Sequence, residues 1–220
     1  ESFENLFMKT VKTIFLASLS PRRRKLLNQI AGNFNLHVKV LKPNPKINMD
    51  ELETPYSNEM PKKYVARIAL KKAITATENM IEMGRKYLPI LAADTTVSFK
   101  DKILGKPKSK KQATKMLKML SNNSHKVFTS VVLIHHFKED NRQTKLEFDQ
   151  ITQCSTVWFG NLSENWLNNY IESGEPMDKS GGYGIQGKAQ EVIKKLNGSY
   201  SGVMGLPLFE TSEMLQNLDL

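Results

Sequence analysis

A short apolar segment that runs directly into a basic helix start constrains this chain most. Residues 13–17 have the composition of a buried strand, and serines follow them. Ser20 has the side chain of a helix N-cap and Pro21 suits the first helical position, so the sequence predicts a helix over 21–30. The first turn of this helix carries Arg22, Arg23 and Arg24.

Three arginines at that position favour an anion nearby. Cations in a first helical turn face the positive end of the helix dipole, which costs about 0.3–1 kcal/mol each. Free backbone N–H groups, the hydroxyls of Ser18 and Ser20 and the guanidinium groups can together bind a phosphate. A solvated basic helix start explains the same residues, and composition alone leaves both interpretations open.

The composition narrows the class of protein. The chain has 220 residues, of which 40% are hydrophobic, and we expect a flexible tail over 1–12 and a single domain over 13–220. No apolar run approaches the roughly 18 residues that cross a membrane, so no membrane partner is expected. The one cysteine, Cys154, cannot form an internal disulfide, which favours a reducing compartment and predicts a cytoplasmic protein.

The net charge of +10 favours anionic partners. Nucleotides and nucleic acids both qualify. The chain has no zinc-finger spacing, RNA-recognition signature or long basic run, so nucleic acid is the less favoured of the two.

Strand-like and helix-like segments alternate along the chain, which predicts a mixed α/β fold with two lobes around a cleft. Apolar residues at helical spacing predict a long helix over 61–83. Two alternating runs, 126–137 and 145–159, predict antiparallel neighbours. A buried strand over 88–93 is expected to end just before Asp94.

Carboxylates at two places are candidates for chemistry. Asp94 is expected at the carboxyl end of its strand, where ligands of open α/β sheets bind, although an aspartate there also suits a plain turn. The loop 44–58 holds Asp50, Glu51 and Glu53. Such residues are usually solvated, but Mg²⁺ binds through one or two carboxylates together with waters and phosphate oxygens.

A glycine-rich loop over 180–187 contains the pattern Gly-x-Gly-x-x-Gly from Gly182 to Gly187. No strand precedes it and no helix opens after it, so we reject a dinucleotide-binding interpretation. The glycines would instead let the backbone approach a flat base. The amide of Gln186 offers a donor and an acceptor, which complement the N3–H and a carbonyl of uracil or thymine.

Several motifs in the same order resemble one known family. They are Leu16-Ala17-Ser18-Leu19-Ser20-Pro21-Arg22-Arg23-Arg24, Ala93-Asp94-Thr95, Gly105-Lys106-Pro107, Glu175-Pro176-Met177-Asp178-Lys179, Tyr183-Gly184-Ile185-Gln186-Gly187 and Val203-Met204-Gly205-Leu206-Pro207. With these motifs the chain closely resembles the Maf family of nucleoside-triphosphate pyrophosphatases. The resemblance implies an elongated, strongly twisted mixed sheet flanked by helices, similar to inosine-triphosphate pyrophosphatases, and a homodimer.

The resemblance also implies roles for individual residues. Asp94 would be catalytic, as a metal ligand or as the group that takes a proton from water. Glu51 matches the glutamate of the family's acidic pair and would be the second ligand of Mg²⁺ or Mn²⁺, with Asp50 as the fallback. Lys72 and Lys106 would face the β- and γ-phosphates, and Ser18 and Arg23 would bind the triphosphate.

Three further positions bear on base preference. One group of the family prefers dTTP and UTP, whereas the group that prefers N7-methyl-GTP tends to carry Trp, Gln and Glu where this chain has Arg22, Thr95 and Gln186. All three residues therefore imply the pyrimidine group.

The resulting hypothesis is metal-dependent hydrolysis of dTTP or UTP to the monophosphate and pyrophosphate, with CTP and modified pyrimidine triphosphates as further candidates. A family member acting on N7-methyl-GTP is the nearest alternative. The alternative from another class is a non-catalytic protein that binds nucleic acid or a division partner through its basic surface.

Overall fold

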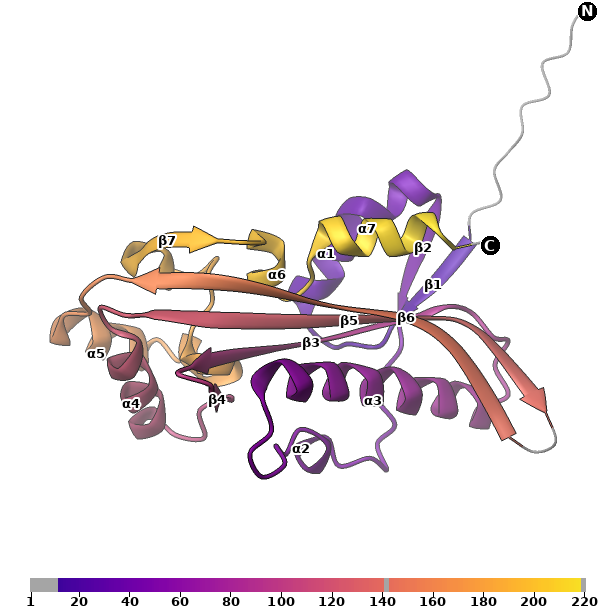
Figure 1. Ribbon diagram of the computed structural model, residues 1–220, viewed down its shortest axis with the longest axis horizontal. Helices are drawn as coiled ribbons and strands as arrows, with labels where there is room; N and C mark the ends of the chain where they lie inside the picture. The colour runs from indigo at the N-terminus through magenta and orange to yellow at the C-terminus, as the bar shows by residue number, and fades with distance from the viewer. Residues whose placement is uncertain (1–11, 141–142, 219–220) are drawn as a thin grey trace, which may run out of the picture.

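The computed structural model describes residues 12–140 and 143–218, and within them seven strands form one sheet in the order β2-β1-β3-β5-β6-β7, with β4 paired to β3 (Figure 1). The expected tail over 1–12 lies outside the described residues except for Lys12, which opens β1. The strands are β1 (Lys12–Leu16), β2 (Leu36–Val40), β3 (Ile90–Phe99), β4 (Lys102–Leu104), β5 (Ser124–Asp140), β6 (Gln143–Phe159) and β7 (Ile193–Asn197).

The sheet is mixed, as expected. β1 pairs in parallel with β2 and β3, whereas β3, β5, β6 and β7 pair antiparallel in turn. The two longest strands, β5 and β6, form the predicted antiparallel pair and give the molecule its elongated shape in Figure 1. The mixed α/β class is therefore confirmed, while the extent of a single domain over 13–220 stays a prediction.

Helices cover both faces of the sheet (Figure 1). They are α1 (Pro21–Ala31), α2 (Met49–Leu52), α3 (Pro61–Glu82), α4 (Lys110–Leu120), α5 (Glu164–Glu172), α6 (Tyr200–Met204) and α7 (Leu208–Gln216), with 3-10 turns η1 (Gly32–Phe34), η2 (Glu175–Asp178), η3 (Ser180–Gly182) and η4 (Lys188–Val192). In the part of the chain that the structure describes, no helix is both long and apolar enough to cross a membrane.

The alternation of side chains along β3 decides which helices each residue meets. Leu91 and Ala93 pack with α1 and α7, whereas Ala92 packs on the other face with α3. Successive residues of a strand point to opposite faces. Asp94 therefore points toward α3, and Thr95 points toward α1.

The strand that carries Asp94 is longer than predicted. We expected it to end before Asp94, but β3 continues through Phe99 because β5 pairs with it without a break from Ile90 to Ser98. The opening is instead on the other edge of β3. There the last residue of β1 lies opposite Leu91 and the last residue of β4 lies opposite Val97, so Asp94 lies in the gap between these two neighbours.

Candidate active site

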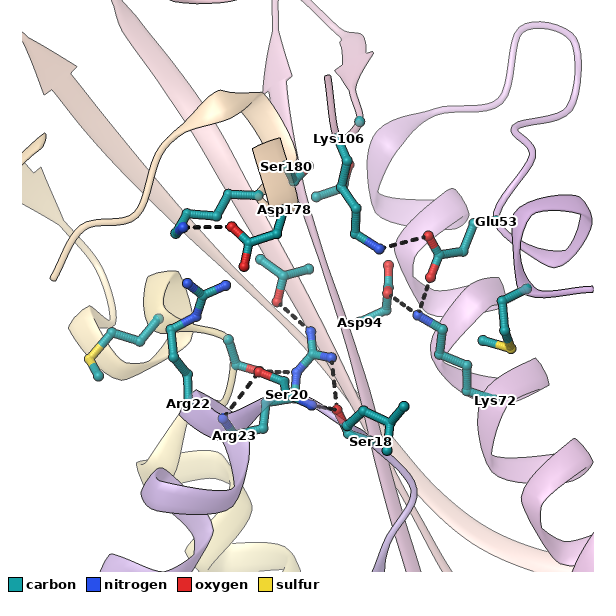
Figure 2. Close-up of a pocket in the computed structure, with 18 of the residues that line it drawn as sticks. Ser18, Ser20, Arg22, Arg23, Glu53, Lys72, Asp94, Lys106, Asp178 and Ser180 are labelled. Carbon is teal, nitrogen blue, oxygen red and sulfur yellow. Dashed lines mark hydrogen bonds and ion pairs between the residues drawn. The ribbon is translucent and has the colours of Figure 1, made fainter. Parts of the chain in front are cut away.

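A cavity of about 600 Å³ lies at this gap, between the start of α1, the chain before α3, β3 and the segments 178–186 and 203–205 (Figure 2). Most of the predicted site residues line it. They are Ser18, Arg22, Arg23, Lys72, Asp94, Thr95, Lys106 and Gln186.

The start of α1 forms as predicted and presents its polar groups to the cavity. Pro21 is the first helical residue, and the hydroxyl of Ser20 accepts a hydrogen bond from the backbone N–H of Arg23 at 3.4 Å. The hydroxyl of Ser18 accepts from the N–H of Ser20 at 3.2 Å. Because both hydroxyls belong to the strand–helix turn, their positions are set by the local backbone.

Arg23 is held from three sides. Its Nε donates to the carbonyl oxygen of Gly205 at 2.8 Å, Nη2 to Thr95 Oγ1 at 3.1 Å and Nη1 to Ser18 Oγ at 3.4 Å. Burial lowers the pKa of Arg23, and the carboxylate of Asp94 opposes this effect. Among the described residues no carboxylate oxygen lies within 4 Å of the guanidinium, so its charge has only neutral oxygens as partners.

On the α3 side, one ammonium group joins two carboxylates (Figure 2). Lys72 Nζ lies 2.7 Å from Asp94 Oδ1 and 2.7 Å from Glu53 Oε1, and Lys106 Nζ lies 3.2 Å from Glu53 Oε2. Burial raises the pKa of Glu53, but Lys72 and Lys106 outweigh it, so the pKa lies below its ordinary value. Both carboxylates are thus held near one point of the cavity by lysines.

The structure places Glu53, and not Glu51, in this cluster. Glu53 continues the turn of α2, with its N–H bonded to the carbonyl oxygen of Met49 at 3.0 Å. Residues two apart on a helical turn point to nearly opposite sides, so Glu51 faces solvent and accepts from Asn48 Nδ2 at 3.0 Å. The predicted role of Glu51 is therefore without support from the geometry, and the side chain of Asp50 lies outside the described residues.

Contacts with α3 hold the segment that presents Glu53. The hydroxyl of Tyr64 donates to the carbonyl oxygen of Glu53 at 2.8 Å. Arg67 pairs with both carboxylate oxygens of Glu59 at 2.6 Å, and its guanidinium stacks 3.9 Å from the ring centroid of Tyr56. The sequence signal for Glu53 was the acidic cluster itself, but the choice within the cluster needed this helical turn.

Across the cavity, a second charged group that the sequence did not single out comes from the motif around Asp178. Lys179 Nζ lies 2.6 Å from Asp178 Oδ1 and donates to the carbonyl oxygen of Glu175 at 2.6 Å. Burial raises the pKa of Asp178, but Lys179 and Arg22, which lies beside Asp178 in Figure 2, outweigh it, so the pKa lies below its ordinary value. The only sequence signal for this group was its place in a family motif.

Gln186 lies at the exposed rim of the cavity on a loop that Glu175 supports from behind. The Glu175 carboxylate accepts from the N–H of Lys188 at 3.2 Å and from the hydroxyl of Tyr170 at 3.2 Å. A Cβ atom at Gly187 would overlap the Glu175 carboxylate, so any larger residue there requires Glu175 to move away from the loop. The position of Gln186 thus depends on the contact between Glu175 and the loop.

Comparison with known proteins gives one consistent family. A family model described as Maf-like protein matches residues 13–218. A relative from Dechloromonas aromatica (strain RCB) called dTTP/UTP pyrophosphatase is 40% identical over 205 residues, which are 93% of this chain and 96% of the relative. A relative of the same name from Nitrosomonas europaea is 43% identical over 203 residues, 92% of this chain and 93% of the relative.

Among solved structures, the Staphylococcus aureus Ham1 protein covers 94% of this chain and 91% of its own, with 14% identity and a TM-score of 0.36. A TM-score this low does not establish a shared fold. The family model, in contrast, spans the strand–helix turn, the carboxylate cluster and the glycine-rich loop that build the cavity. By this match and by its identity to these relatives over more than nine-tenths of its length, the chain belongs to the Maf-like protein family.

Proposed function

We propose that this protein hydrolyses dTTP and UTP between the α- and β-phosphates, releasing the monophosphate and pyrophosphate. The observation that carries the proposal is the pairing of two kinds of group in one cavity. The start of α1 offers a cation bonded only to neutral oxygens, while Asp94 and Glu53 converge on Lys72 opposite it. Relatives called dTTP/UTP pyrophosphatase, about 40% identical over almost the whole chain, supply the substrate class.

The residues present fit a divalent metal of the Mg²⁺ type. Both acidic groups at the cluster offer oxygen ligands, which hard cations prefer, and Mg²⁺ uses one or two carboxylates plus waters and substrate phosphates. The described residues hold no group of three or more His, Cys, Asp or Glu side chains that could hold a metal by themselves. We therefore propose Asp94 and Glu53 as the protein ligands, and Mg²⁺ or Mn²⁺ bound there would polarise the α-phosphate.

The chain's own residues would accept the proton, stabilise the leaving group and bind the triphosphate. A water attacks the α-phosphorus, the bond to the bridging oxygen breaks, and a carboxylate of the cluster, Asp94 or Glu53, accepts the water's proton. Lys72 and Lys106 stabilise the charge that develops on the leaving pyrophosphate. Ser18 and Arg23 bind the triphosphate from the α1 side.

We place base recognition at the rim of the cavity opposite the carboxylate cluster. Gln186 lines the cavity there, and its amide can pair with the N3–H and a carbonyl of a pyrimidine. Arg22 lies on the same side, beside Asp178. The homodimer implied by the family resemblance and the cytoplasmic location predicted from the sequence stay predictions.

The test is turnover of a nucleotide panel with Mg²⁺ or Mn²⁺, with pyrophosphate and orthophosphate measured separately. We expect pyrophosphate from dTTP and UTP. Pyrophosphate from N7-methyl-GTP alone would contradict the pyrimidine assignment, and orthophosphate alone would place the cut at another bond. Salt-sensitive binding to random DNA without turnover would favour a binding protein instead.

A further inference from the structure

We propose that Thr129, a fully buried residue of β5, is a positioning residue that aims Arg23 at the triphosphate, and that Thr95 serves this task instead of base recognition. Thr129 is outside the set of residues that line the cavity. The inference rests on the proposed function for the identity of the ligand, but it is carried by a chain of hydrogen bonds behind the cavity wall.

The chain of hydrogen bonds has a single possible direction. The hydroxyl of Thr129 donates to the carbonyl oxygen of Gly202 at 2.7 Å. A threonine hydroxyl has one hydrogen, so Thr129 must accept in its 2.9 Å contact with Thr95 Oγ1. Thr95 therefore donates to Thr129, and it accepts from Arg23 Nη2 at 3.1 Å.

This order leaves Thr95 without a hydrogen to offer a nucleotide. Its one hydrogen points to Thr129, and one of its two lone pairs receives Arg23. A hydroxyl in that state cannot donate to a base carbonyl. What it can do is set the direction of one N–H of the guanidinium.

The sheet explains why these two threonines meet. Thr95 of β3 and Thr129 of β5 are directly opposite each other in the antiparallel register. Both lie on the face that α1 and α6 cover, since Thr95 reaches Arg23 and Thr129 reaches Gly202 of α6. The backbone of the sheet and of α6 thus fixes both ends of the chain of hydrogen bonds.

The orientation of the Arg23 guanidinium determines which of its N–H groups can bond to a phosphate. Its Nε is bonded to Gly205, so two contacts from the backbone and the sheet, at Nε and Nη2, define the plane of the guanidinium. The Arg23 side chain is half-buried and has no carboxylate within 4 Å among the described residues. The N–H groups that are not bonded to Gly205, Thr95 or Ser18 can therefore donate to an anion in a fixed direction, and charge-assisted bonds of this kind depend strongly on geometry.

The experiment compares Thr129→Val, which keeps the shape but removes the hydroxyl, with Thr129→Ser, which keeps the hydroxyl. Affinity for inorganic tripolyphosphate is measured by calorimetry in EDTA, where hydrolysis does not interfere. We expect the Val variant to bind about tenfold more weakly, equivalent to about 1.4 kcal/mol, and the Ser variant to bind within about twofold of the wild type. Thr77→Val is the matched control, because the hydroxyl of buried Thr77, within the described parts of the chain, bonds only to Ala73 of its own helix.

Kinetics give the second readout. For the Val variant at residue 129 we expect KM to rise by about the same factor for dTTP, UTP and CTP, with kcat within about threefold of the wild type and the ranking of bases unchanged. Thr95→Val should behave in the same way, and it replaces the first variant if Thr129→Val does not fold. In the double variant the losses should not add, because both substitutions interrupt one chain of hydrogen bonds.

Three results would overturn the inference. They are wild-type tripolyphosphate affinity in a folded Thr129→Val protein, equal losses in the Val and Ser variants, and a Thr95→Val protein with altered base ranking but unchanged tripolyphosphate affinity. Failure of the proposed function is a separate outcome. A wild-type protein that turns over no nucleotide but binds tripolyphosphate in a Thr129-dependent way would refute the activity and keep the inference.

Discussion

Lys72 holds the two carboxylates of the site together. Its side chain is 12% exposed and its ammonium group contacts two carboxylates at the same distance, while Lys106, whose side chain is 57% exposed, contacts only one of them. A buried charge must be paired, and removal of one partner leaves the other uncompensated. The positions of Asp94 and Glu53 are therefore coupled through Lys72, and a change at one carboxylate affects the placement of the other.

The first prediction compares two neighbouring glutamates. Glu53→Gln should lower kcat for dTTP by at least about 100-fold, the lower range for loss of a group acting in proton transfer, whereas Glu51→Gln should have a smaller effect than about threefold. Steady-state kinetics on both variants, with circular dichroism to confirm folding, makes the measurement. The reverse order of effects would restore the role that the sequence motif gave to Glu51.

The second prediction concerns His125, which is buried and bonded through Nε2 to the hydroxyl of Tyr183 at 2.6 Å. Burial lowers its pKa to about 4, and its Nδ1 has no partner among the described residues, so protonation would add an unmatched donor. The unfolded chain takes up this proton at about pH 6.5. The contribution of the neutral His125 to the free energy of unfolding is therefore complete above about pH 6.5, and it is lost as the pH falls toward 4.

Between pH 7 and 5.5 this histidine should lower the free energy of unfolding by about 1 kcal/mol. Urea unfolding of the wild type and of His125→Gln at both pH values measures the difference. Glutamine cannot titrate but can still bond to Tyr183. We expect a smaller pH dependence in the variant, and an equal dependence in both proteins would contradict the assignment.

At the scale of elements, features set by neighbouring residues were predicted correctly, whereas the continuation of β3 and the choice within the acidic loop were not. The N-cap at Ser20 and the start of α1 followed from neighbouring residues, since capping is decided within one turn. The continuation of β3 through Asp94 could not follow from its own sequence, because it depends on pairing with β5. Likewise α2 is four residues long and depends on Tyr64 for its place, so the loop gave no periodic pattern that would separate Glu51 from Glu53.

The third prediction addresses the loop that carries Gln186. Gly187→Ala should displace the loop, because the new Cβ would overlap Glu175 Oε1. We expect the ratio of kcat/KM for dTTP over CTP to change by at least about fivefold, while tripolyphosphate affinity stays within about twofold, since base and phosphate sites are supported separately. Glu175→Ala should act in the same direction.

Gly32→Ala is the control for this pair. Gly32 has helical backbone angles and nothing within 4 Å of its Cβ position, so alanine should leave both readouts unchanged. If Gly187→Ala lowered the affinity for tripolyphosphate and left base selectivity intact, the loop would have to be assigned to the phosphates.

At the scale of the whole molecule, the net charge of +10 bears on the encounter with a triphosphate. Opposite charges raise the association rate, and salt screens this attraction. We expect kcat/KM for dTTP to fall by at least about threefold between about 0.05 and 0.3 M ionic strength, with kcat nearly constant. Stopped-flow or initial-rate assays at fixed free Mg²⁺ make the measurement, and a fall in kcat alone would point to the chemical step.

The bond between Arg23 and Gly205 joins positions 182 residues apart in the chain. During synthesis, at about 5–20 residues per second, the helix that carries Arg23 therefore leaves the ribosome roughly 10–40 s before its carbonyl partner exists. Over that interval the arginine at the start of α1 has no fixed direction, and the Thr129 contact to Gly202 is also missing. A nascent chain of this protein can thus build most of its sheet while it is still unable to hold a nucleotide, and competence arrives only when Gly202 and Gly205 have emerged.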